Sequence, residues 1–62
     1  MTEMIKEQIE AIRRSGETNM LDVKMVQWVA NRKNYFELVI YLEEHRKDYV
    51  NYLLTGGASE QE

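Results

Sequence analysis

The sequence predicts an all-α fold: three helices with a long C-terminal third helix, an arrangement that we expect a second copy of the chain to complete. Apolar residues recur every three or four positions through most of residues 2–54, which is the helical period. Proline is absent, and the three glycines lie outside the periodic segments, so nothing interrupts a helix. At 62 residues, 44% of them hydrophobic, the chain is near the lower limit for an unaided core.

The first helix is expected at about residues 2–14. Ile5, Ile9 and Ile12 repeat at spacings of four and three, so they share one face. Arg13 and Arg14 lie in its last turn, where positive charge favours the helix dipole. Gly16 is the natural residue to end it, because glycine adopts the left-handed conformation at little cost.

The second helix is expected at about residues 20–33, with Asn19 as its cap. Its apolar residues cover more than half of the helical circumference: Leu21, Val23, Met25, Val26, Trp28, Val29 and Ala30. The β-branched members make a strand conceivable. Strict alternation is lacking, however, and the segment is longer than a typical strand, so we predict a helix.

The third helix is expected at about residues 35–54, with Asn34 and Glu37 in capping-box spacing at its start. Twenty residues would make it about 30 Å long. Apolar groups surround most of its circumference, and such a helix needs cover on several sides. Because two short helices can cover only part of it, we expect a homodimer built mainly on this helix.

Residues 1–57 therefore form one helical domain, and residues 58–62 are expected to be a disordered acidic tail. The residues predicted to be buried at its centre are Ile9, Val26, Val39 and Leu42. Arg46 projects between Val39 and Val50, near the middle of the apolar stripe. Two readings stay open for it: its stem packs while its head reaches water, or it pairs with a carboxylate of another helix or subunit.

Composition excludes several classes of function. The net charge is −3, and eight basic against nine acidic residues remain outside residues 58–62, so no long-range attraction to nucleic acid or anionic membrane is expected. Without cysteine there is no disulfide or thiolate chemistry. No apolar run approaches the roughly 18 residues of a membrane span, and the first twenty residues lack a signal-peptide core. We expect a cytoplasmic protein.

No catalytic, metal or cofactor motif is present. His45 is the only histidine, and Asp48 lies three residues further on. One histidine and one carboxylate fall short of the four ligands usual for zinc, so a half-buried structural imidazole is expected. The turn at residues 15–19 could dock an anion at the following helix, but Glu17 and Asp22 place negative charge there, which favours a plain connection. We therefore expect neither an enzyme nor a bound cofactor.

Aromatic residues give the remaining clues. Trp28 is either a core residue or an anchor for a partner, since tryptophan is common in both places. The tyrosines of the third helix leave the same choice, because each offers apolar area and a hydroxyl. The candidate residues for a partner or dimer interface are Trp28, Phe36, Ile40, Tyr41, His45, Arg46 and Tyr52.

Two stretches carry a family resemblance. The first runs from Gly16 to Val23 and continues at Val26-Gln27 and Ala30. The second comprises Leu38, Leu42-Glu43-Glu44-His45-Arg46, Tyr49-Val50 and Leu53-Leu54-Thr55-Gly56. Together they resemble a family of small proteins from phages and prophages of Firmicutes, a domain of unknown function. The resemblance implies a mobile-element origin and a small accessory role, and it implies no activity or site.

These observations favour a non-enzymatic helical interaction protein that binds a host or phage protein. The alternative is a helix-turn-helix DNA-binding regulator. In that reading Ala30 takes the small position of the motif, Asn34 stands where glycine often does, and the recognition helix begins at Phe36. Such a helix should offer basic and amide side chains to DNA, whereas residues 36–41 offer five apolar or aromatic groups and an acid. No nucleic-acid partner is therefore expected.

Overall fold

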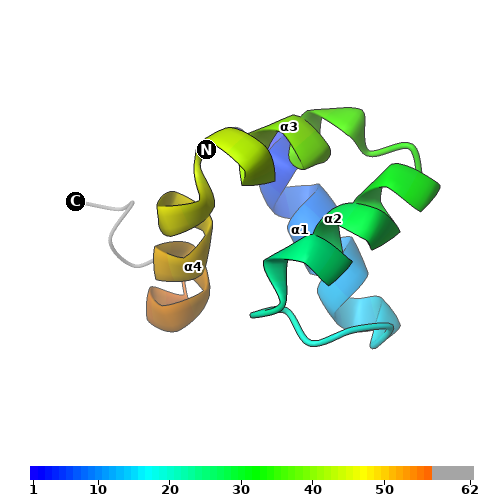
Figure 1. Ribbon diagram of the computed structural model, residues 1–62. Helices are drawn as coiled ribbons and strands as arrows, with labels where there is room; N and C mark the ends of the chain where they lie inside the picture. Colours follow the sequence, from blue (N-terminus) through cyan, green and yellow to red (C-terminus); the bar gives the residue numbers. More distant parts are fainter. Residues whose placement is uncertain (57–62) are drawn as a thin grey trace.

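The computed structural model describes residues 1–56, and this part of the chain contains four helices and no strand. They are α1 (Glu3–Ser15), α2 (Val23–Arg32), α3 (Phe36–Glu44) and α4 (Arg46–Thr55). In Figure 1, α1 lies behind α2, α3 lies along the top, and α4 descends at the left. The all-α class is confirmed. The tail predicted at residues 58–62 lies outside the described residues.

The first helix follows its sequence pattern. The Thr2 hydroxyl oxygen accepts a hydrogen bond from the Ile5 N–H at 3.1 Å and caps α1. Gly16 ends the helix in the left-handed conformation, with φ of 67°. Ile5, Ile9 and Ile12 are all buried, so the predicted core face of α1 is confirmed.

The second helix begins three residues later than predicted, and Asn19 is not its cap. The Asp22 carboxylate caps α2 by accepting a hydrogen bond from the Met25 N–H at 3.3 Å. The Asn19 side chain instead accepts from the Leu21 N–H at 2.9 Å and forms a turn before the helix. Because Met20 stays outside the helix, its carbonyl can accept a hydrogen bond from the Tyr49 hydroxyl at 2.6 Å.

The single third helix predicted for residues 35–54 is wrong, because the backbone leaves the helical conformation at His45, with φ of −131° and ψ of 44°. Residues 43–48 are six consecutive exposed polar residues. An unbroken helix would place Arg46 between Val39 and Val50 on the apolar side. The break moves Arg46 into the exposed first turn of α4 and directs Tyr49 into the core.

The predicted capping role of Asn34 is also wrong. Asn34 has a φ of 65° and ends α2 instead of starting α3. Its N–H donates to the Asn31 carbonyl at 3.0 Å, and the Tyr35 N–H donates to the Ala30 carbonyl at 2.8 Å, which is the Schellman pattern. Asparagine is the residue that most often replaces glycine in this conformation. The start of α3 at Tyr35 has no side-chain cap.

One apolar core joins all four helices: Ile5, Ile9, Ile12, Val23, Val26, Val29, Ala30, Leu38, Leu42 and Tyr49. Ile9, Val26 and Leu42 are fully buried as predicted. Val39, predicted to be buried, is only half-buried and packs against the edge of this core. Burial raises the pKa of the Tyr49 hydroxyl to about 12, since the charged phenolate would lose its hydration.

Candidate functional site

Several large apolar side chains remain outside the core on α2 and α3. The exposed fractions are 57% for Trp28, 56% for Phe36 and 55% for Ile40. Met25 is also exposed and lies three residues before Trp28, while Phe36 and Ile40 are four residues apart, so each pair shares one helix face. We call Met25 and Trp28 the tryptophan patch, and Phe36 and Ile40 the α3 face.

The tryptophan patch is held in place by charged neighbours. The Arg32 guanidinium lies 5.1 Å from the centre of the Trp28 ring, within the range of a cation–π interaction. Arg32 also pairs with Glu17, and the Lys33 ammonium lies 3.1 Å from the same carboxylate. These contacts fasten the loop after α1 to the end of α2. Trp28 is therefore an exposed residue beside a fixed cation, and the core reading of Trp28 is wrong.

His45 and Arg46 lie at the junction of α3 and α4. The His45 ring lies 5.2 Å from the Tyr41 ring, and its Nδ1 is 3.6 Å from the Asp48 carboxylate. Both His45 and Arg46 are exposed, so the predicted half-buried imidazole is wrong. Arg46 makes no ion pair with any residue from 1 to 56, and it does not pack in the middle of an apolar stripe, because the stripe is broken just before it.

Tyr52 contacts its own fold. Its hydroxyl donates a hydrogen bond to the Glu10 carboxylate at 3.1 Å, and its ring packs half-buried against the core. Burial, together with the hydrogen bond to Glu10 and the negative charge of that residue, raises the pKa of this hydroxyl. Tyr52 therefore joins α4 to α1. The residues that the sequence grouped as one interface are distributed over different parts of the surface.

Three of those residues do meet in one groove. Ile40, Tyr41 and His45 line a shallow groove of about 280 Å³ between α3 and the start of α1. We call it the α3 groove; its other lining residues are Thr2, Ile5, Glu37 and Glu44. Sequence reasoning missed the two carboxylates. Their signal was the spacing of 37, 40, 41 and 44, which places an acid at each end of an apolar pair on one helix face.

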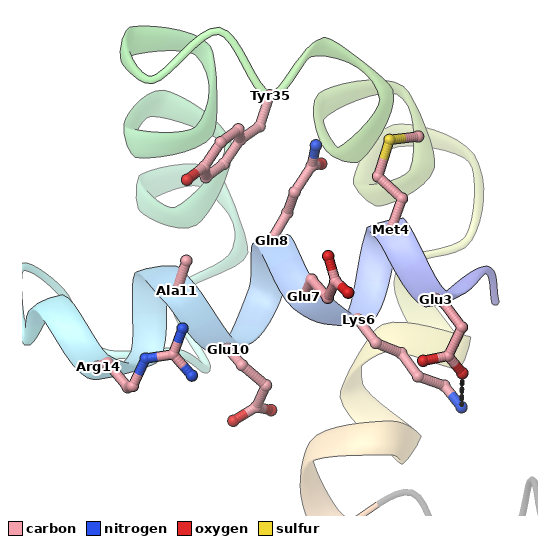
Figure 2. A pocket seen from close by; sticks show the side chains of 9 residues that line it. All are labelled: Glu3, Met4, Lys6, Glu7, Gln8, Glu10, Ala11, Arg14 and Tyr35. Atoms are coloured by element: carbon pink, nitrogen blue, oxygen red, sulfur yellow. Dashed lines mark ion pairs between the residues drawn. The ribbon is translucent and has the colours of Figure 1, made fainter.

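A second groove, of about 630 Å³, runs along α1 beside Tyr35. Figure 2 shows Tyr35 projecting toward Ala11, with Gln8 between Tyr35 and Met4. The Gln8 side-chain oxygen is buried without a hydrogen-bond partner among the described residues. The charged residues along this groove have both signs, and Lys6 and Glu3 pair with each other at 4.0 Å. This mixture gives the groove no preference for a ligand of one charge.

Neither groove is lined by a serine or a cysteine that could act as a nucleophile. Within residues 1–56, no three histidine or acidic side chains are gathered so that they could hold a metal ion. None of the helices in the same range has the length and apolar character needed to cross a membrane. The described surface thus offers apolar and charged contacts.

Comparison with other proteins identifies the family of the chain. No curated protein and no solved structure matches the chain. A family model described as a domain of unknown function matches residues 1–57, which is nearly the whole sequence. The chain belongs to this family, DUF5049.

Proposed function

We propose that the protein is a small non-enzymatic helical module that acts by binding other proteins. The observation that carries this proposal is the exposure of Trp28, Phe36 and Ile40 beside a core that is already closed by Tyr49. Tryptophan and other large apolar side chains are the usual anchors of protein interfaces. Exposed on α2 and α3, they give two apolar surfaces of the kind that marks interaction sites.

The proposed partners include a second copy of the chain. The tryptophan patch supports this part, because a flat aromatic anchor can pair with its own symmetry mate in a dimer. Light scattering between about 10 μM and 1 mM should show the mass rise from the 7.4 kDa monomer toward twice that value. Trp28→Ala should remain monomeric, whereas Leu54→Ala, a change at another exposed apolar residue, should still associate. A parent protein that stays at monomer mass throughout would contradict the homodimer.

The α3 face is proposed to bind a different protein. In a pull-down from the natural host, Phe36→Ala with Ile40→Ala should lose the captured protein, and Leu54→Ala should retain it. The helical circular dichroism signal of both variants should match the parent, because none of these side chains belongs to the core. Equal capture by the double variant and the parent would refute binding through this face.

An accessory role in a phage or prophage is part of the proposal, supported by the resemblance of residues 16–56 to such proteins. The genes beside its own provide the test. Neighbouring genes for capsid, packaging or lysis proteins would support the role, and a place within an operon of host metabolism would contradict it.

One observation favours a second candidate, a helix-turn-helix regulator. α2 and α3 are joined by only residues 33–35, Ala30 is buried near the end of α2, and Asn34 adopts the left-handed conformation that glycine often has in this motif. Against it, α3 carries Glu37, Glu43 and Glu44 and no basic residue, so its surface repels phosphate. A gel shift at about 150 mM salt should show no duplex binding. Sequence-specific binding in that assay would replace the interaction proposal.

A further inference from the structure

We propose that the α3 groove binds a basic amphipathic helix of another protein, with arginine or lysine residues placed against Glu37 and Glu44. This inference rests on the proposed function and specifies the chemistry of the partner. It begins from the charge of the α3 groove, whose lining residues include Glu37, Glu44 and His45 but no arginine or lysine. A helix surface of one sign attracts a partner of the opposite sign and excludes one of the same sign.

The two carboxylates are available for such a partner. Glu37 and Glu44 are exposed, and neither makes an ion pair with a residue from 1 to 56. Glu43, by contrast, accepts a hydrogen bond from the Gln27 side chain at 3.3 Å. Glu44 is seven positions after Glu37, which is about two turns or 10 Å along one side of the helix. Both line the groove, one turn on either side of Ile40 and Tyr41.

An apolar floor lies between them. Ile40 and Tyr41 belong to the intervening turn, and the buried Ile5 of α1 lines the same groove. Arginine and lysine have long apolar stems with a charge at the tip, so they can pack on such a floor while the tip reaches a carboxylate. Arginine can also donate two parallel hydrogen bonds to one carboxylate. A helix with two basic residues seven apart and an apolar residue between them fits both the spacing and the chemistry of the groove.

Several of the chain's own basic residues are already paired within its fold. Arg13 pairs with Glu10 at 3.6 Å, and Arg32 and Lys33 pair with Glu17. Nucleic acid is excluded as the occupant, because its phosphates carry the same sign as Glu37 and Glu44.

The test uses a fluorescein-labelled helical peptide with arginines seven residues apart and leucines between them, and a counterpart in which glutamate replaces each arginine. Fluorescence anisotropy should show that the full-length protein binds the arginine peptide and not the glutamate peptide. Glu37→Gln with Glu44→Gln should weaken binding about tenfold or more. Glu3→Gln with Glu7→Gln removes the same charge from residues lining the other groove and should leave affinity within about twofold.

Three results would overturn the inference: no binding of the arginine peptide up to about 1 mM, equal binding of the glutamate peptide, or equal affinity of the parent and the Glu37/Glu44 variant. Thermal melts of the variants establish that each is folded before binding is compared. If peptide binding fails while Phe36→Ala with Ile40→Ala still abolishes capture of the host protein, the α3 face is correct and only its basic partner is wrong. If the parent protein also captures no host protein, the proposed function itself fails.

Discussion

The three helices α1 to α3 and the single helix α4 are held in different ways. Each of the first three contributes at least two buried aliphatic side chains, from Ile5 on α1 to Leu42 on α3. The only fully buried residue of α4 within residues 1–56 is Tyr49, which also donates a hydrogen bond to the Met20 carbonyl. The unit of α1 to α3 is held by fully buried aliphatic side chains. The docking of α4 depends on one fully buried ring, on the half-buried side chains of Val50, Tyr52 and Leu53, and on hydroxyl hydrogen bonds at its edge.

Leu42→Ala should lower stability the most, because it removes a fully buried side chain from the core of α1 to α3. A cost of about 2–5 kcal/mol is expected from the lost burial and the cavity left behind. In a chain of this size that is enough to unfold the whole molecule. Thermal unfolding, monitored by far-ultraviolet circular dichroism, measures this loss of stability.

Leu54→Ala is the matched control, since Leu54 is 73% exposed at the end of α4. Its melting temperature should stay close to that of the parent. A Leu42→Ala protein that melts like this control would show that the α3 core face is assigned wrongly.

Tyr49→Phe should rank second. It keeps the ring but leaves the Met20 carbonyl without its 2.6 Å hydrogen bond, at a cost of about 1–3 kcal/mol. Tyr35→Phe is the control, because the Tyr35 hydroxyl has no hydrogen-bond partner among residues 1–56. Chemical denaturation measures the free energy of unfolding of both variants. If the two lose the same stability, the hydroxyl of Tyr49 does not hold α4.

The Tyr49 hydroxyl also makes the stability of the fold depend on pH. Its pKa rises from 10.0 to about 12 on folding, so above pH 10 the unfolded chain releases a proton that the folded chain keeps. The contribution of Tyr49 to stability is therefore complete below pH 10 and is lost as the pH rises toward 12. Denaturation at several pH values should show this loss in the parent and a smaller one in Tyr49→Phe.

Asn34→Ala should have a smaller effect, within the unit of α1 to α3. At a φ of 65° an alanine Cβ crowds the following carbonyl, so a cost of about 1 kcal/mol is expected. Asn34→Gly should equal or exceed the parent in stability, because glycine adopts this conformation freely. Asn31→Ala, an exposed change inside α2, should be nearly neutral. An alanine variant as stable as the glycine variant would contradict the left-handed assignment.

Tyr52→Phe should have the smallest effect, less than about 1 kcal/mol, because the lost hydrogen bond to Glu10 is only half-buried and Glu10 keeps its contact with Arg13. Hydrogen exchange should be faster in α4 while α1 to α3 keep their protection. Uniformly faster exchange in all four helices would mean that α4 does not open separately and would remove the distinction between the two regions.

Individual residues show how far the sequence could predict this fold. The spacing of Ile5, Ile9 and Ile12 identified a buried face because one local period decides it. Asn34 was misassigned because asparagine favours both the start of a helix and the left-handed residue after one, and only the Schellman hydrogen bonds separate the two. Arg46 on an apolar stripe was the available sign of a broken helix.

The candidate site was harder to predict. Ile40, Tyr41 and His45 were named, but the groove that joins them needs Thr2 and Ile5 from the other end of the chain. Long-range proximity of this kind depends on packing and not on any local pattern. Tyr52 looked like part of an interface for the same reason: its contact with Glu10 spans 42 residues.

The one-residue junction at His45 has a consequence for how the sequence can change. Each residue added to or removed from a helix rotates the remainder of that helix by about 100°. One residue inserted between Arg46 and Tyr49, in the first turn of α4, would rotate Tyr49 by this angle relative to the junction and turn its hydroxyl away from Met20. The number of residues between His45 and Tyr49 is therefore constrained, and related chains are expected to keep it.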